Sequence, residues 1–154
     1  MKTVVLKFGG TSVGSIDRIK KIAHIIGSYK KKNIGVIVVS SAMSGVTNDL
    51  IKKTKELSDN FDPAEFDALL SSGEQVACAL IAGRLKHLGY QARSWMSWQI
   101  PIFTDGPYGA ARINKIGKNK ILKFINMGGV SIITGFQGVN QDNRITTLGR
   151  GGTD

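Results

Sequence analysis

The chain has 154 residues, of which 42% are hydrophobic and 21% are charged, a composition typical of a globular domain and unlike that of a disordered segment. No apolar run reaches the ~18 residues of a membrane-spanning helix, and Lys7 interrupts the short N-terminal run at residues 4–6, which excludes a signal-peptide core. The 21 Lys and Arg outnumber the 11 Asp and Glu, and the formal charge of +10 favours polyanionic partners, either nucleic acid or phosphorylated metabolites.

The first elements predicted along the chain are a strand and a helix. Residues 4–8 form a short apolar run that ends at a glycine pair. Ser15 is a suitable N-cap for the segment that follows, because its hydroxyl oxygen can accept a hydrogen bond from the first helical turn. After Ser15, apolar residues recur at the i, i+3, i+4 and i+7 spacing of one helix face, at Ile19, Ile22, Ala23 and Ile26. The sequence therefore predicts a strand, a glycine-rich turn and an amphipathic helix, in that order.

Strand and helix signals continue to alternate along the rest of the chain. Residues 34–39 are rich in β-branched side chains without polar alternation, which predicts a strand covered on both faces. A helical stretch, either continuous or broken near residues 71–73, runs from Pro63 to Leu88 and ends at Gly89. The other predicted elements are a loop at 40–45, helices at 46–57 and 113–127, and strands at 91–96, 100–103 and 130–134.

This alternation predicts an α/β fold, a three-layer αβα sandwich with a mainly parallel central sheet. In such sheets, ligands bind at the C-terminal ends of the strands. Glycine-rich segments follow predicted strands at three places, residues 9–14, 40–45 and 149–152. These three strand-end loops are the main functional signal in the sequence.

Lys7 and the glycine pair that follows it have the features of a phosphate site. Glycines let backbone N–H groups approach a phosphate closely, and the next helix directs its positive end toward the same place. The Lys7 ammonium supplies a point charge for oxygens that gain negative charge during phosphoryl transfer. A tight turn between strand and helix is the alternative explanation of Gly9 and Gly10. The segment matches neither the Walker lysine pattern nor a dinucleotide-binding fingerprint.

Three further segments carry candidate binding residues. Hydroxyl side chains cluster at residues 40–48, where Thr47 is positioned as a helix cap. Glu74 is predicted at a helix start, where a carboxylate is favourable in itself and could also bind a substrate ammonium. Arg150 lies between glycines on a loop and suits bidentate capture of a carboxylate, with a polar surface turn as the alternative.

Taken in order, these segments resemble the aspartate kinases of the amino-acid kinase superfamily. The matching stretches are residues 7–12, 41–48, 72–74, 135–138 and 146–154. The most specific stretch is Thr-Thr-Leu-Gly-Arg-Gly-Gly-Thr-Asp at the end of the chain. Related kinases of glutamate, acetylglutamate or nucleoside monophosphates share the glycine loops but generally lack this string. The resemblance covers the whole chain and implies the amino-acid kinase fold in incomplete form.

The resemblance implies ATP-dependent phosphorylation of the L-aspartate side-chain carboxylate to 4-phospho-L-aspartate, the first step of lysine, threonine and methionine biosynthesis. Magnesium would be held mainly by the ATP phosphates, without a protein metal site. No general base is needed, because the attacking carboxylate is already ionised at neutral pH. The catalytic task is therefore positioning and charge neutralisation.

By the same resemblance, the phosphate side of the site consists of residues near the ends of the first two strands: Lys7, Phe8, Gly9, Gly10 and Ser41. Lys7 and the glycine amides would hold the transferring phosphate, and Ser41 would lie beside the reacting groups. Asp154 would orient Lys7 or help to place the metal. Lys7 and Asp154 are the expected catalytic residues.

The residues that would bind aspartate come from three segments: Thr47, Glu74, Arg150, Gly151, Gly152 and Thr153. Glu74 would face the substrate ammonium, and Arg150 would pair with the α-carboxylate. Thr153 stands where family members more often have serine, a change that keeps the hydroxyl.

Aspartate kinases are much longer than this chain. Residues 1–154 are therefore expected to form the N-terminal, amino-acid-binding part of a kinase domain, without the nucleotide-binding half and the regulatory domains. Two hypotheses follow: an aspartate kinase in intact form, or a catalytically inactive folded fragment or binding remnant. The expected partners are L-aspartate and ATP rather than a membrane, with a homo-oligomeric intact family member and a cytoplasmic location.

Other candidate residues give weaker signals. His24 and His87 have no Cys or second His at metal-ligand spacing. Cys78, the single cysteine, fits a reducing compartment and a core position. The lysines are spread along predicted helices without interleaved aromatic residues, which favours solvated helix faces over a nucleic-acid groove. A basic nucleic-acid binder is the third hypothesis.

Overall fold

A parallel four-stranded sheet, here called sheet A, forms the centre of the computed structural model, which describes residues 2–149. Its strands are β1 (Thr3–Phe8), β2 (Gly35–Ser40), β6 (Val130–Thr134) and β3 (Ala92–Trp95), in the spatial order β1-β2-β6-β3. All five residues of β6 are buried, as expected for an inner strand covered on both faces. The predicted parallel sheet is confirmed.

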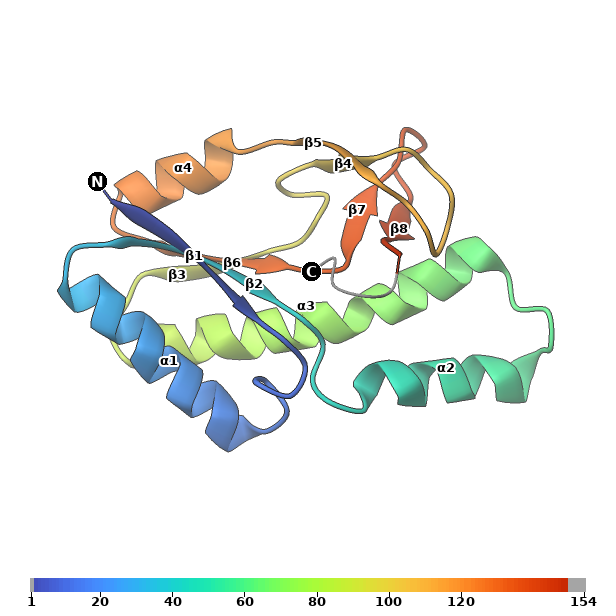
Figure 1. Ribbon diagram of the computed structural model, residues 1–154, viewed down its shortest axis with the longest axis horizontal. Coiled ribbons are helices and arrows are strands. Elements are labelled where there is room, and N and C mark those ends of the chain that lie inside the picture. The colour runs from blue at the N-terminus through green and yellow to red at the C-terminus, as the bar shows by residue number, and fades with distance from the viewer. Residues whose placement is uncertain (1, 150–154) are drawn as a thin grey trace.

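Helices cover both faces of sheet A. On one face lie α1 (Ile16–Lys31) and α3 (Pro63–His87), and on the other lies α4 (Asn119–Asn126) (Figure 1). The remaining helix, α2 (Val46–Leu57), packs against α3. The arrangement is the three-layer αβα sandwich that the sequence predicts. None of the described helices is both long enough and apolar enough to cross a bilayer.

Two hydrophobic clusters hold the layers together. The larger one lies under α1 and α3 and includes the four predicted apolar residues of α1, each at most 3% exposed. Full burial of each isoleucine stabilises the fold by about 1.5–3 kcal/mol relative to exposure. The predicted cap is also present, because the Ser15 Oγ accepts a hydrogen bond from the Arg18 N–H at 3.3 Å. The smaller cluster lies under α4, where Trp95 packs edge-on against Phe124.

A second four-stranded sheet, which sequence patterns did not predict, lies beside the first. Its strands are β4 (Ile102–Thr104), β5 (Ile113–Ile116), β7 (Gln137–Val139) and β8 (Ile145–Thr147), in the order β5-β4-β7-β8. Only β4 and β7 run parallel. The strand predicted at residues 100–103 overlaps β4, whereas β7 and β8, with three residues each, are too short for a periodic signal to stand out.

The helix predicted at residues 113–127 is wrong in its first part. Residues 113–116 form the exposed strand β5, and α4 begins only at Asn119. The two isoleucines of β5 are 45% and 49% exposed, so they do not extend the buried face of α4. Gly117 separates the two elements and packs against Pro101.

Of the two alternatives for the stretch after Pro63, the unbroken helix is the one observed, because α3 is continuous over 25 residues. Ser71 and Ser72 turn their hydroxyls back onto the helix and donate to the carbonyls of Ala68 and Leu69 at 2.8 and 2.7 Å. Helix-breaking residue types are therefore accommodated without a kink. The continuity places residues 67 and 74 on one rigid element.

Candidate functional site

The carboxyl ends of three neighbouring strands of sheet A meet at one edge. In the strand register, Phe8 of β1 lies beside Ser40 of β2, and Ser40 lies beside Thr134 of β6. Backbone hydrogen bonds extend this contact past the strands: the Ser41 N–H donates to the Phe8 carbonyl, and the Gly135 N–H donates to the Ser40 carbonyl, both at 3.0 Å. The loops after the three strands are thus held side by side, where ligands bind in such sheets.

Lys7 and the glycines after it lie at this edge. Lys7 is an exposed residue of β1, and its Nζ would be 3.9 Å from a Cβ placed on Gly9, so the ammonium lies near the glycine loop. A Cβ on Gly10 would approach the Ala42 carbonyl to 3.1 Å. The loop after β1 therefore packs closely on the loop after β2, and glycine leaves its backbone open to an anionic group.

Glu74 reaches the same loops from α3. It lies in the middle of that helix rather than at a helix start, which corrects the sequence prediction. Its side chain is 3% exposed, and its Oε1 accepts a hydrogen bond from the Ala42 N–H at 3.0 Å. Gly73 makes this approach possible, because a Cβ there would lie 2.8 Å from the Ala42 Cβ.

The prediction that Thr47 caps a helix is wrong as well. Gly45, with φ of 86°, is the N-cap of α2, and no side chain caps the helix. Glycine tolerates this left-handed conformation, so the chain turns into α2 without a hydroxyl cap. Thr47 is the second residue of α2 and is half-buried, as is Ser41 in the preceding loop.

The predicted residues Arg150, Gly151, Gly152, Thr153 and Asp154 lie outside the described residues. The segment that leads to them is described. The Leu148 N–H donates to the Phe136 carbonyl at 2.9 Å, and Phe136 is two residues from the end of β6. Through Gly135 and Ser40, this contact links the end of β8 to the strand ends that carry Lys7. The chain up to Gly149 is thereby led back to the edge of sheet A.

Sequence reasoning missed Asp67, a fully buried residue of α3. Its Oδ1 accepts from the Thr147 Oγ1 at 2.7 Å, and its Oδ2 accepts from the backbone N–H groups of Thr147 and Gly109 at 2.7 and 2.9 Å. The only sequence signal was its spacing of seven residues from Glu74, which places both carboxylates on the same helix face.

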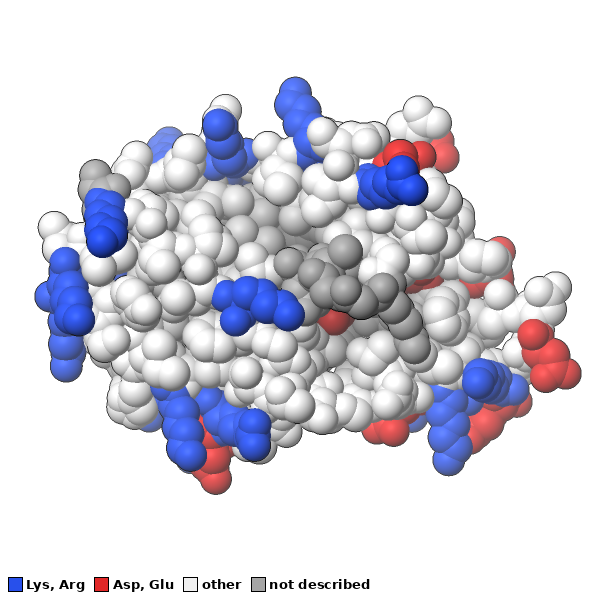
Figure 2. Space-filling view, in the orientation of Figure 1, with Lys and Arg blue, Asp and Glu red and all other residues white. Residues whose placement is uncertain are grey.

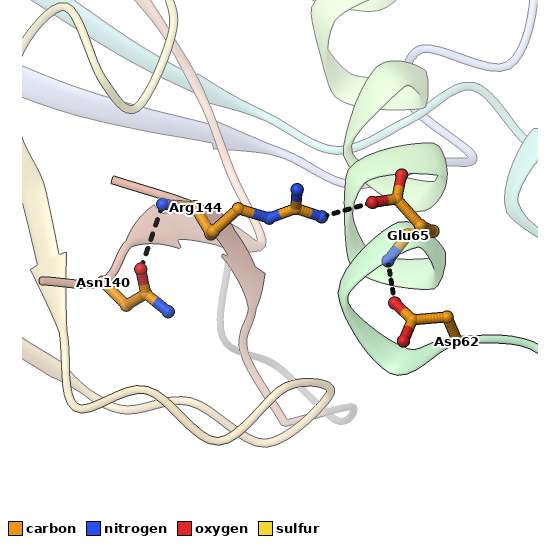
Figure 3. A network of polar contacts seen from close by, with 4 residues as sticks. All are labelled: Asp62, Glu65, Asn140 and Arg144. Atoms are coloured by element: carbon orange, nitrogen blue, oxygen red, sulfur yellow. Dashed lines mark hydrogen bonds and ion pairs between the residues drawn. The ribbon is translucent and has the colours of Figure 1, made fainter. Parts of the chain in front are cut away.

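The turn between β7 and β8 is also tied to the start of α3 (Figure 3). Asp62 caps α3 by accepting from the Glu65 N–H at 2.9 Å, and Glu65 pairs with the Arg144 guanidinium at 2.6 Å. Hydrogen bonding to Glu65 and its charge raise the pKa of Arg144. The Asn140 Oδ1 holds the turn by accepting from the Arg144 N–H at 3.0 Å. Both ionic side chains are exposed, so the pair contributes little to stability.

Charge is unevenly distributed over the face seen in Figure 2. Most basic side chains lie around the rim, with a further basic group near the centre of the view, whereas most acidic ones lie toward the end where α2 and the start of α3 are found. The described surface of this face therefore has no continuous basic stripe of the kind that follows a nucleic-acid backbone. The nucleic-acid hypothesis gains no support from this view.

Cys78 lies in the core, as predicted, and should be chemically inert in the folded chain. Burial, with the charge of Glu74 as a smaller cause, raises the pKa of its thiol. The thiol therefore stays protonated at about pH 8, where thiolate is the reactive form. We expect iodoacetamide to label the urea-unfolded chain and to leave the native chain unmodified, as read by mass spectrometry.

The raised pKa of Cys78 also makes the stability of the fold depend on pH in the alkaline range. The Cys78 thiol of the unfolded chain ionises at about pH 8.5, whereas that of the native chain stays protonated there. The free energy of unfolding therefore keeps its full value below about pH 8.5 and falls as the pH rises above it, because only the unfolded state loses the proton. In the iodoacetamide experiment, rapid labelling of Cys78 in the native chain would contradict its assignment to the core.

Comparison with known proteins shows the family to which the chain belongs. The amino acid kinase family matches residues 2–154. The chain is 48% identical to the aspartokinase of Rickettsia conorii and 45% identical to that of Geobacillus stearothermophilus, in both cases over its whole length. It covers 39% and 38% of those two proteins, so it spans about two fifths of their length.

Solved structures agree with this comparison. The crystal structure of E. coli aspartokinase III in complex with aspartate and ADP has a TM-score of 0.81 at 25% identity, over 99% of this chain and 44% of that one. Aspartate kinase from Synechocystis has a TM-score of 0.80 at 35% identity, over 99% of this chain and 25% of that one. Both similarities cover the described part of the chain with its two sheets.

Proposed function

Because the chain belongs to the amino acid kinase family, we propose that residues 1–154 form the N-terminal, amino-acid-binding part of an aspartate kinase domain. The intact enzyme would transfer the γ-phosphoryl group of ATP to the side-chain carboxylate of L-aspartate and release ADP. The curated relatives are named aspartokinases, and more than half of their length has no counterpart in this chain. That additional length would supply the nucleotide-binding half and the regulatory domains.

The phosphate side of the site would be built from the loops after β1 and β2. Lys7 and the backbone N–H groups of Phe8, Gly9 and Gly10 would hold the transferring phosphoryl group, with Ser41 beside it. The close packing of Gly10 on Ala42 fits this role, because a side chain there would fill the space next to the loop. Bound magnesium would neutralise charge on the ATP phosphates. Asp154 would orient Lys7 or help to place that ion.

The aspartate side would be built from α2, α3 and the segment after β8. Glu74 would face the substrate ammonium, Arg150 would bind the α-carboxylate as a bidentate partner, and Thr47 would contact the substrate from the first turn of α2. Gly151, Gly152 and Thr153 would complete this wall of the site.

Positioning accounts for the chemistry of the proposed reaction. A side-chain oxygen of aspartate attacks the γ-phosphorus, and the bond from that phosphorus to the β–γ bridging oxygen breaks. The attacking carboxylate is already ionised at neutral pH, so no side chain has to remove a proton. The task of the protein is to bring two anions together and to neutralise their charge, which is what Lys7 and Arg150 would provide.

One observation carries the proposal: the chain segment before Arg150 returns to the strand ends next to Lys7. The contact of Leu148 with Phe136, and of Gly135 with Ser40, supports a single cleft between a phosphate-binding loop and an amino-acid-binding loop. A basic residue from each side would then face the same space. The intact protein is also expected to be homo-oligomeric and cytoplasmic.

The proposal can be tested in a hybrid enzyme. In this hybrid, the chain replaces the matching segment of the Geobacillus stearothermophilus aspartokinase, which aligns with it over 154 residues. We expect ADP release that depends on L-aspartate and magnesium ATP, and a product that hydroxylamine traps as a hydroxamate, the signature of an acyl phosphate. L-Glutamate serves as the control substrate and should give no release.

The same assay addresses the alternative, a catalytically inactive folded fragment. We favour this alternative for the chain alone, because the chain covers only about two fifths of the relatives' length. The isolated chain should release no ADP, because the nucleotide-binding half is proposed to lie outside it. A hybrid that melts cooperatively but shows no aspartate-dependent turnover would leave the binding remnant as the better hypothesis.

A further inference from the structure

We propose that Asp67 and Thr147 are positioning residues for the amino-acid substrate: by fixing β8 to α3, they set where the chain leaves β8 relative to the loops after β1 and β2. The inference rests on the proposed function and goes beyond it, because neither residue would touch the substrate. It starts from a buried carboxylate that the proposed chemistry does not use.

The surroundings of Asp67 are those of a structural clamp. Its side chain is fully buried, and none of the ion pairs found among residues 2–149 involves it. Burying an ionised carboxylate without a cation is costly unless hydrogen bonds compensate. Three short ones do so, two from Thr147 and one from the Gly109 N–H. Charge-assisted bonds of this kind are about twice as strong as neutral ones, so the connection to β8 is stiff.

Asp67 belongs to a polar face of α3 that touches three different segments. Asp67, Ser71 and Glu74 occupy the i, i+4 and i+7 positions, and each is at most 3% exposed. Asp67 binds β8, the Ser71 carbonyl accepts from the Gln137 Nε2 of β7 at 3.0 Å, and Glu74 binds the Ala42 N–H. The buried face of α3, which is apolar in most helices, here carries three polar contacts to other segments.

This face links the two halves of the proposed site. Residues 67 and 74 are about 10 Å apart along the helix axis, at ~1.5 Å per residue. In sequence, the segment proposed to bind the amino acid follows three residues after Thr147, so the clamp fixes the strand from which that segment starts. Because one uninterrupted helix holds Ala42 at one point and Thr147 at another, it fixes the spacing between the loop after β2 and the end of β8.

The exposed pair of Arg144 with Glu65 supplies a matched control. It ties the same hairpin to the same helix, but its side chains are 43% and 60% exposed. A surface pair of this kind is expected to contribute little. Glu65→Gln therefore removes the ionic part of a connection between α3 and the β7–β8 turn without touching the buried clamp.

The experiment measures KM for L-aspartate and for ATP in the hybrid enzyme. Asp67→Asn keeps the shape of the side chain but removes its charge, and Thr147→Val removes one hydroxyl donor. Both should raise the KM for aspartate by about tenfold, because the clamp is loosened, with the KM for ATP changed less than about twofold. Thr147→Ser restores the hydroxyl and should restore the aspartate KM, and Glu65→Gln should leave it unchanged.

The possible results separate this inference from the proposed function. A parent hybrid without aspartate-dependent activity contradicts the proposed function and, with it, the premise of the clamp. An active parent whose Asp67→Asn and Thr147→Val variants keep the parental aspartate KM overturns the inference alone. Equal increases of both KM values, together with a lower melting temperature, would assign Asp67 a role in stability only and would also overturn it.

Discussion

Replacing Lys7 with alanine is expected to lower kcat of the hybrid enzyme by about 10²–10³-fold, the usual effect of removing one pre-organised charge from a transition state. Lys7 is exposed at the carboxyl end of β1, with its Nζ near the backbone of Gly9. Negative charge grows on the oxygens of the transferring phosphoryl group, and the ammonium would interact with that charge more strongly than with the ground state. The loss should therefore fall on kcat.

Lys2→Ala is the control for this experiment. Lys2 is an exposed residue just before β1, at the opposite end of the strand from Lys7. Its removal changes the net charge by the same amount and should leave turnover unchanged. Lys7→Ala should also retain the melting temperature of the parent, because an exposed lysine contributes little to packing. Undiminished turnover in Lys7→Ala would refute the role assigned to this residue.

The second large effect concerns two glycines of α3 that should respond to alanine in opposite directions. A Cβ at Gly73 would lie 2.8 Å from the Ala42 Cβ and 3.3 Å from the Val46 Cγ1, whereas a Cβ at Gly83 would meet nothing within 4 Å. Alanine favours a helix over glycine by about 1 kcal/mol. At Gly83 this preference acts alone, and we expect stabilisation of about 0.5–1 kcal/mol.

At Gly73 the overlap should outweigh helix propensity. Overpacking costs about 1–3 kcal/mol, and here it falls on a loop whose Ala42 N–H is held by Glu74. We expect Gly73→Ala to lower the free energy of unfolding in urea by up to about 2 kcal/mol and to lower kcat in the hybrid, because the loop beside Lys7 shifts. Equal stabilisation by both substitutions would show that α3 does not pack closely on this loop.

The sequence predicted the elements whose structure depends on residues close together in the chain. The apolar spacing of Ile19 and Ile26 and the cap at Ser15 defined α1, and the β-branched run at residues 34–39 defined β2. The strand-end loops at Gly9 and Ser41 could be placed together because parallel strands bring their carboxyl ends to one edge. These features depend on residues close in sequence.

Features that depend on distant residues were missed or misplaced. The buried carboxylate of Asp67 makes sense only through Thr147, 80 residues away, and no local spacing reveals that partner. The three-residue strands of the second sheet are held by cross-strand contacts such as that of Thr104 with Thr146 at 2.7 Å. No local pattern gave a reason for glycine at position 73, which its close contact with Ala42 explains.

The proposed function requires that the side chains of Lys7 and Arg150 face one cleft. Chemical cross-linking of cysteines at these two positions tests this directly. Cys78 is buried, so a Lys7→Cys/Arg150→Cys variant presents two reactive thiols. A short bismaleimide should bridge them rapidly. In the Lys2→Cys/Arg150→Cys control, the first thiol is about 16 Å further along the strand, at ~3.3 Å per residue, and should remain unbridged. Bridging of the control pair with none between positions 7 and 150 would place residue 150 near the amino end of β1, away from Lys7, and would contradict the kinase assignment.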